Sequence, residues 1–156
     1  MKKISKCRIC NYKKFDTIMN LGNLYFTGRF PKKFQKIPKA ILKLIKCRKC
    51  DLVQLQHNFN MKQMYGSFYG YQSSLNSWMV DHLKKNVQNL RKYLSSKDII
   101  IDIGSNDATT LNFFEKKIQK YGFDPSAKKF IKNYKNNTKL ICDFFNYESI
   151  KKLRLE

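Results

Sequence analysis

The stretch "DIIIDIGSNDATTL", residues 98–111, decides the fold of the second half of this 156-residue chain. A continuous apolar run of this kind is typical of a strand buried on both faces of a parallel sheet. The pattern then continues as a helix at 108–120, a strand at 121–124, a helix at 125–137 and a strand at 139–145. This β-α-β-α-β order predicts an α/β fold, the first half of a doubly wound, Rossmann-like sheet.

The glycine turn that ends the first of these strands has the residues of a ligand-binding loop. Asp102, Gly104, Asn106 and Asp107 fall at the carboxyl end of the strand, where open α/β sheets bind nucleotides. Gly104 allows the backbone to approach a ligand closely, and Asn106 can adopt the left-handed conformation that a second glycine would otherwise supply. Asp124 follows Gly104 by 20 residues and ends the second strand, where a carboxylate can accept hydrogen bonds from ribose hydroxyls.

The same turn indicates which nucleotide it binds. A dinucleotide would require G-x-G-x-x-G, and the turn has neither that pattern nor the G-K-[ST] of a Walker loop. Asp107 stands at the helix N-terminus that a pyrophosphate would occupy, and its charge would repel the phosphates. The turn therefore suits a ligand with a ribose, no phosphate and a positive amino or sulfonium group, and S-adenosylmethionine (SAM) meets these conditions. Asp143, after the third strand, lies beside the expected adenine position. The alternative is a structural turn without a ligand.

Four cysteines form two Cys-x-x-Cys pairs, "CRIC" and "CRKC". Each pair can direct two thiolates at one ion from a tight turn, so Cys7, Cys10, Cys47 and Cys50 together predict a tetrahedral Zn²⁺ site. Four thiolates leave no open position for a reactive water, which makes the predicted site structural. A chance arrangement and a redox pair are the alternatives. The fifth cysteine, Cys142, is expected to be a small buried residue of the third strand.

Composition leaves two kinds of partner open. The net charge is +21, from 32 Lys+Arg against 11 Asp+Glu. Such a field favours polyanions, so a zinc-ribbon nucleic-acid-binding protein is an alternative function. Lysine is scattered along the chain rather than clustered, however, which favours a merely solvated surface. No apolar run approaches the ~20 residues of a membrane helix, and no signal-peptide core follows the first lysines, so we expect a cytoplasmic protein.

Three segments differ in pattern. They are a zinc-binding domain at residues 1–60, an aromatic loop with a connecting helix at 61–97, and a partial SAM-binding domain at 98–156. In the middle segment, apolar residues recur at steps of three and four from Leu75 to Leu94, which predicts an amphipathic helix capped by Ser73 or Ser74.

Taken in order, these motifs resemble the sugar C-methyltransferase family. The resemblance is carried by the two Cys-x-x-Cys pairs, "LVQL" at 52–55, "YGYQSS" at 69–74, "IDIGSNDATTL" at 101–111 and "GFDPS" at 122–126. It implies an N-terminal zinc-binding domain, a class I SAM-dependent methyltransferase core, and methylation of a carbon of a nucleotide-linked deoxysugar. It also places Tyr71 near the sugar, and His82 is a second candidate for contact with the substrate. Packing is the alternative role for both side chains.

The chain departs from the family pattern in two residues and in length. Asp51 and Ala108 stand where the family usually has glycine. A left-handed turn at position 51 would still tolerate Asp. Ala108 adds a methyl group close to the expected cofactor. The sequence stops at Glu156, just after the third strand, whereas a class I core needs further strands. We therefore expect an N-terminal portion that is not active alone. A separate chain with the missing half is a candidate partner, and a non-catalytic remnant is the alternative.

Overall fold

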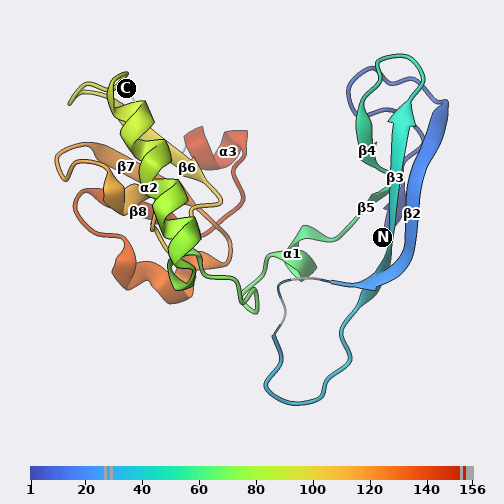
Figure 1. Cartoon of the computed structure of the whole chain (residues 1–156), viewed down its shortest axis with the longest axis horizontal. Helices are drawn as coiled ribbons and strands as arrows, with labels where there is room; N and C mark the ends of the chain where they lie inside the picture. Colours follow the sequence, from blue (N-terminus) through green and yellow to red (C-terminus); the bar gives the residue numbers. More distant parts are fainter. Residues whose placement is uncertain (27, 29, 152, 154–156) are drawn as a thin grey trace. The chain divides into compact units, whose positions relative to one another are not determined.

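The computed structural model describes residues 1–26, 28, 30–151 and 153, so the end of the predicted domain 98–156 lies partly outside the described residues. The chain is a mixed α/β protein that divides into two compact units, Met1–Tyr65 and Gly66–Glu156. The three sheets, with their strands, are seen in Figure 1.

The first unit is built on an antiparallel sheet with the strand order β2-β3-β4. Its elements are β1 (Lys2–Lys3), β2 (Phe15–Tyr25), β3 (Lys39–Cys47), β4 (Val53–Leu55), β5 (His57–Asn58) and α1 (Met61–Met64). The strand β2 begins just after the first Cys-x-x-Cys pair, and β3 ends in the second. Because Phe15 of β2 lies opposite Cys47 of β3, the antiparallel pairing brings both cysteine pairs to the same end of the sheet.

The core of the first unit is small. In the described part of residues 1–65, the buried apolar side chains are Cys7, Ala40, Ile45 and Cys47. Two of these four are cysteines of the predicted zinc site. A domain with so few buried apolar groups gains too little free energy of folding from burial alone. It needs a further stabilising element, such as a bound metal ion.

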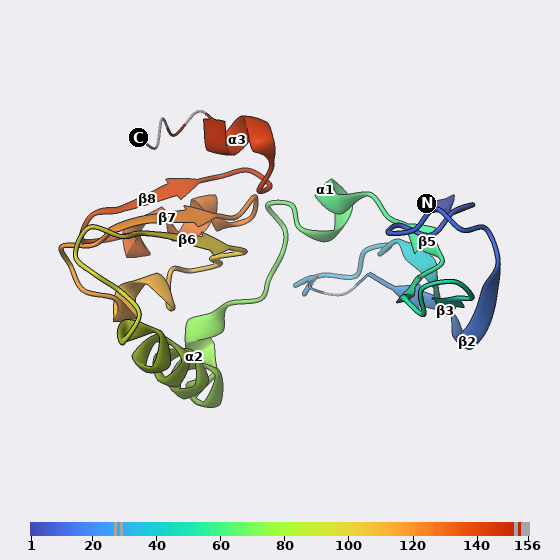
Figure 2. The same cartoon turned by 90° about the horizontal axis from the view of Figure 1, so that it is seen from above.

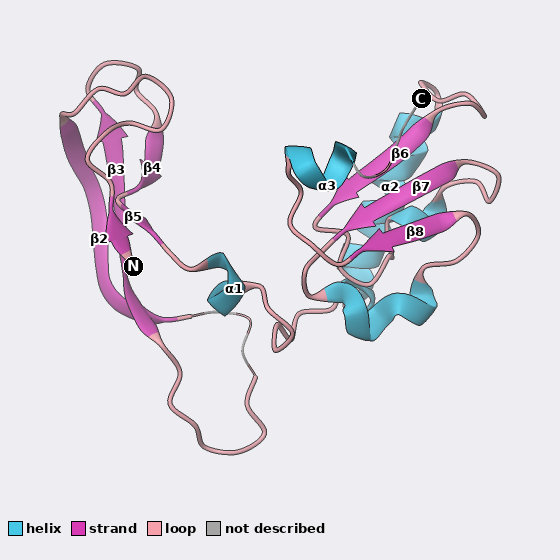
Figure 3. Cartoon of the chain, turned by 180° about the vertical axis from the view of Figure 1, so that it is seen from behind, coloured by secondary structure: helices cyan, strands magenta, loops and turns pink. Residues whose placement is uncertain are grey.

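The second unit contains the parallel sheet β6-β7-β8, which Figure 3 shows face-on with its three strands side by side. Its elements are η1 (Ser73–Leu75), α2 (Ser77–Arg91), β6 (Ile99–Ile103), η2 (Leu111–Phe113), β7 (Gln119–Phe123), η3 (Ala127–Asn133), β8 (Thr138–Ile141) and α3 (Tyr147–Lys151), where η marks a 3-10 helix. The parallel strands predicted around residues 98, 121 and 139 are confirmed in order, although β7 begins two residues before its expected start.

The predicted amphipathic helix is present as α2, which lies on one side of the parallel sheet (Figure 2). Val87, in the middle of its apolar stripe, is fully buried, whereas Leu75 and Leu90 are exposed. The predicted cap is wrong, because Asn76 caps the helix by accepting a hydrogen bond from the Met79 backbone N–H at 3.3 Å. Leu75 lies in η1, before the helix, and therefore does not share its buried face.

The two α-helices predicted between the parallel strands are wrong. The helical structure described within residues 108–120 is the 3-10 turn η2 alone, and the last two of these residues already belong to β7; within residues 125–137 it is the 3-10 helix η3. Ala108 has φ +66°, a conformation outside a right-handed helix, and Phe114 is extended at ψ 159°. The buried Lys120 ammonium then donates to the carbonyl oxygens of Glu115 and Ile118 at 2.9 and 3.0 Å, and these bonds hold a turn rather than a helix.

Two expectations of burial are also wrong. The apolar run of β6 is not covered on both faces, because Ile99, Ile101 and Ile103 are 41%, 36% and 61% exposed. Among the described residues, the strand lies at an edge of the sheet and pairs with β7 alone. Cys142 is exposed, since β8 ends at Ile141 and the cysteine follows it in the loop.

Gly122, in the centre of β7, leaves the space that the loop after β6 needs. A Cβ atom at this position would lie 2.5 Å from Ser105 Oγ and 2.6 Å from Tyr134 Cε1. We expect Gly122→Ala to lower the free energy of unfolding by about 1–3 kcal/mol, because a close-packed site cannot absorb an added methyl group. Urea unfolding measures this loss. The double variant with Ser105→Gly should recover part of it, and a Gly122→Ala variant as stable as the wild type would contradict this packing.

Candidate zinc centre and cofactor loop

The two Cys-x-x-Cys segments have matching backbone hydrogen bonds. The N–H of Asn11 donates to the Cys7 carbonyl at 3.1 Å, and the N–H of Asp51 donates to the Cys47 carbonyl at the same distance. Asn11 and Asp51, directly after the second cysteine of each pair, have φ +60° and +57°. The expectation that Asp51 adopts a left-handed conformation is confirmed. Each segment is therefore a tight turn that presents two sulfur atoms on one side.

The four sulfur atoms lie close enough to share one ion. Cys7, Cys10, Cys47 and Cys50 place their sulfur atoms within 4.8 Å of one another. Sγ of Cys7 is 3.7 Å from that of Cys50, and Sγ of Cys10 is 3.5 Å from that of Cys47. Zinc–sulfur bonds of ~2.3 Å in a tetrahedron require sulfur–sulfur distances of about 3.8 Å. The donor set therefore fits Zn²⁺, and these four thiolates can hold it without an open position.

The electrostatics of the cluster also favour a cation. The backbone N–H of Cys10 lowers the pKa of the Cys7 thiol to about 6. The backbone N–H of Leu52 favours the Cys50 thiolate, but the neighbouring thiols of Cys10, Cys7 and Cys47 raise the pKa of Cys50 to about 12. The Cys7 thiolate thus forms easily, whereas the ionisation of the neighbouring Cys50 thiol is hindered. A dication among the sulfurs would remove that repulsion.

The predicted cofactor loop, Gly104–Asp107, follows β6 and contains two left-handed residues. Gly104 has φ +80° and Asn106 has φ +48°, so the left-handed conformation expected for Asn106 is confirmed. A Cβ at Gly104 would meet nothing within 4 Å, which leaves open space over the backbone. Ala108, where the family usually has glycine, is buried with φ +66°.

Asp124, which directly follows β7, holds this loop in place through hydrogen bonds to its carboxylate. Its Oδ2 accepts a hydrogen bond from the Asn106 N–H at 2.9 Å, and its Oδ1 accepts from the Ser126 N–H and Oγ–H at 2.7 and 2.6 Å. A carboxylate offers about four lone-pair directions, so three of them are used within the protein. Tyr134 adds a bond from its hydroxyl to the Asn106 carbonyl at 2.8 Å. Sequence reasoning gave no role to Ser126, although it ends the motif "GFDPS", and it missed Tyr134, which lies in no motif.

The aromatic segment "YGYQSS" is bound to the same loop. The N–H of Ser73 donates to Asn106 Oδ1 and the N–H of Ser74 to Asp107 Oδ2, both at 3.0 Å, while Asn106 Nδ2 donates to the Tyr71 carbonyl at 3.1 Å. The side chains of the loop thus fix residues that lie more than thirty positions earlier. The structure therefore brings Tyr71 next to the predicted cofactor loop.

The other predicted site residues lie apart from this network. Asp102, in β6, is half-buried; burial and then the charge of Asp124 raise its pKa. Asp143 is exposed and accepts the N–H of Phe144 at 2.7 Å. His82 is exposed on α2, and its Nε2 lies 3.0 Å from Asn86 Nδ2. No described contact connects His82 or Asp143 to the loop.

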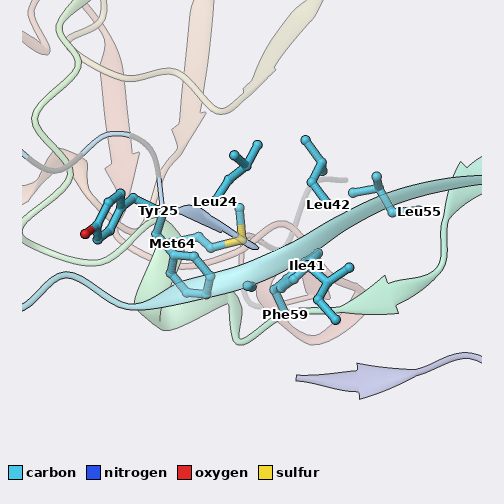
Figure 4. Close-up of a pocket in the computed structure, with 9 residues that line it drawn as sticks. Leu24, Tyr25, Ile41, Leu42, Leu55, Phe59 and Met64 are labelled. Carbon is cyan, nitrogen blue, oxygen red and sulfur yellow. The ribbon is translucent and has the colours of Figure 1, made fainter. Parts of the chain in front are cut away.

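The first unit also has an apolar pocket of about 280 Å³ (Figure 4). Its lining side chains come from β2 and the residue after it, from β3, β4 and α1, and from the segment between β5 and α1: Leu24, Tyr25, Phe26, Ala40, Ile41, Leu42, Leu55, Phe59 and Met64. The Phe26 and Phe59 rings meet edge to face at 6.0 Å. The pocket contains no acid, base or metal ligand, so it offers apolar surface rather than a reactive centre. No helix among the described residues is long and apolar enough to cross a membrane.

Comparison with known families gives a match within the first unit. Residues 7–65 match the family model Methyltransf_13, which is described as "Putative zinc binding domain". The match begins at Cys7 and includes all four clustered cysteines. No curated protein matches the chain. Residues 7–65 are therefore similar to a zinc-binding domain associated with methyltransferases, and their four cysteines can hold the ion.

Proposed function

We propose that the chain serves SAM-dependent methyl transfer, with the second unit holding the cofactor and a nucleotide-linked deoxysugar accepting the methyl group at carbon. The observation that carries the proposal is the loop Gly104–Asp107, fastened at the carboxyl ends of adjacent parallel strands by the Asp124 carboxylate. The strand order, with β7 between β6 and β8, supports this proposal because one half of a doubly wound sheet would have the same order. The methyltransferase-associated zinc domain at residues 7–65 supports the same function.

The residues at the loop fit the groups that SAM would present. The open space over Gly104 admits a ligand close to the backbone. Asp124 keeps about one lone-pair direction for a ribose hydroxyl, since three are used within the protein. Asp102 has a carboxylate to which the described part of the chain donates no hydrogen bond, and an amino or sulfonium cation would stabilise its charge.

Within this proposal, each residue has a limited role. SAM supplies an electrophilic methyl group. Asp102 and Asp124 orient the cofactor, and Asn106 and Asp107 hold the segment that carries Tyr71. The Tyr71 side chain, 38% exposed, can then donate a hydrogen bond to the sugar. The role of His82 in contacting substrate stays a proposal, with weaker support because it lies on the exposed side of α2.

Calorimetric titration of the full chain with SAM tests this function. We expect binding by the wild type and a loss of about 10- to 100-fold in affinity for Asp102→Asn, because a hydrogen bond to a charged group contributes ~1.5–3 kcal/mol. The variant should stay folded. A raised pKa means that the ionised carboxylate is disfavoured in the folded state, so its stability contribution falls as the pH rises through that pKa.

Asp81→Asn is the matched control, because it makes the same change in charge at an exposed position of α2. It should bind SAM like the wild type. A wild-type chain that keeps its zinc and its fold but does not bind SAM would contradict the proposed function.

A further inference from the structure

We propose that Gln54, oriented by Arg8, is an outer-shell residue of the zinc centre that donates a hydrogen bond to the Cys7 sulfur and strengthens zinc retention. The Gln54 side chain in β4 is 7% exposed, and Cys7 is 1% exposed. Gln54 Nε2 lies 3.3 Å from Cys7 Sγ, well within the range of an N–H···S bond. The inference concerns the metal site alone and does not depend on methyl transfer.

Arg8 determines which end of the Gln54 amide faces the sulfur. The backbone N–H and the Nη1 of Arg8 both donate to Gln54 Oε1, at 3.3 and 3.0 Å. Because two donors meet the amide oxygen, the NH₂ group is the end that faces Cys7. If the Gln54 amide were rotated by 180°, its NH₂ group would face the two Arg8 donors and its oxygen would face the Cys7 thiolate.

The Arg8 side chain is itself fixed by the strands beside it. Nη1 also donates to the Leu55 carbonyl at 2.7 Å, and Nη2 donates to Asn58 Oδ1 at 2.6 Å. A continuous chain of hydrogen bonds therefore runs from β5 through Arg8 and Gln54 to the sulfur. These hydrogen bonds fix the orientation of the Gln54 amide, which is how outer-shell residues orient a metal ligand.

The chemistry of a four-thiolate site makes this bond useful. Zn²⁺ neutralises only part of the charge of four thiolates, so the centre is dianionic. An N–H donor draws electron density from the sulfur, and the Arg8 cation behind it offsets the remaining charge. The Cys7 thiolate is thereby made less reactive toward alkylating reagents than the Cys50 thiolate, which is exposed. We expect Cys50 to be the first thiolate of the site to be alkylated and Cys7 among the last.

Zinc competition with a chromophoric chelator tests the proposal on the full chain. Gln54→Leu removes the donor at similar size, and we expect it to weaken zinc binding by about 10- to 100-fold, the usual effect of losing an outer-shell partner. Gln54→Glu places a carboxylate against the thiolate and should weaken it further. Gln56→Leu is the matched control, a half-buried glutamine two residues away, and it should stay within about twofold of the wild type.

Cobalt substitution gives a readout that a loss of packing would not produce. Removing an N–H···S bond raises the energy of the sulfur donor electrons, so the thiolate-to-Co²⁺ charge-transfer band of Gln54→Leu should move to longer wavelength. If Gln54→Leu does not fold, Arg8→Met provides a second test, because it leaves the Gln54 amide free to rotate. We expect Arg8→Met to lower the zinc affinity and to move the charge-transfer band to longer wavelength, each by less than Gln54→Leu. Affinity and band equal to those of Gln56→Leu would overturn the proposal, whatever the outcome of SAM titration.

Discussion

Removal of zinc is expected to unfold residues 1–65 and to leave the parallel sheet of the second unit intact. Cys7 and Cys47 are half of the buried apolar side chains described in the first unit, and the two turns that carry them bring their sulfur atoms together in one cluster. Structural zinc contributes an apparent ~10–16 kcal/mol in small zinc domains. This is comparable to the whole stability of a typical small domain, which is about 5–15 kcal/mol.

Amide spectra of the full chain, recorded with and without excess EDTA, measure this effect residue by residue. The resonances of β2, β3 and β4 should lose their dispersion, while those of β6, β7 and β8 keep it. Adding zinc back should restore the first set. Retention of the β2-β3-β4 amides after complete removal of the metal would show that zinc does not hold this unit together.

Serine substitutions separate the zinc site from a general sensitivity to loss of a thiol. Cys47→Ser removes a buried ligand and should reproduce the effect of EDTA. Cys142→Ser makes the same chemical change at an exposed cysteine outside the cluster, and it should behave like the wild type.

Asp124→Ala is expected to have the second largest effect, on both stability and SAM binding. The carboxylate is 7% exposed and accepts hydrogen bonds from Asn106 N and from two groups of Ser126. Bonds to a charged group contribute ~1.5–3 kcal/mol each, and the donors left unpaired add their own cost. We therefore expect the free energy of unfolding of the second unit to fall by about 3 kcal/mol or more.

Thermal and urea unfolding of the full chain measure the loss, with Asp143→Ala as the control. Asp143 is exposed, and the hydrogen bond described for its side chain is to the N–H of its neighbour Phe144, so its replacement should cost less than about 1 kcal/mol. An Asp124→Ala variant as stable as Asp143→Ala would mean that the carboxylate does not fasten the loop. Because Asp124 supports the loop, its replacement would weaken SAM binding even without a direct contact to the cofactor. Asp102→Asn is therefore the variant that tests the proposed cofactor site.

The features that the sequence could predict are those with a short-range cause. The spacing of Cys7, Cys10, Cys47 and Cys50 predicts a shared ion, and the structure brings their sulfurs together. The left-handed conformation of Asn106 follows from its place in a turn that lacks a second glycine. Both depend on a few adjacent residues, so the local pattern contains the necessary information.

Other features could not be predicted because buried or tertiary contacts decide them. Residues 108–120 have helical periodicity, yet Ala108 is left-handed and the buried Lys120 ammonium bonds to two carbonyls close by in the chain. Ser73 and Ser74 are good capping residues, but their N–H groups bond to Asn106 and Asp107, and Asn76 caps α2 instead. For the two serines, tertiary hydrogen bonds outweigh a local preference.

The same reasoning applies to the residues around the two candidate sites. Gln54 and Arg8 lie in "LVQL" and "CRIC", but their pairing across 46 positions is visible only once β4 lies beside the first cysteine turn. Tyr134 likewise reaches the Asn106 carbonyl from a segment 28 positions away. Neither contact has a spacing that a sequence pattern would reveal.

Native mass spectrometry of the full chain, with and without SAM, tests the central claim most directly. We expect one zinc ion bound to each chain and, when SAM is added, a further mass increase that corresponds to one SAM molecule. The SAM adduct should be weaker in Asp102→Asn and unchanged in Asp81→Asn. A chain that carries one zinc ion and stays folded but shows no SAM adduct would contradict the account.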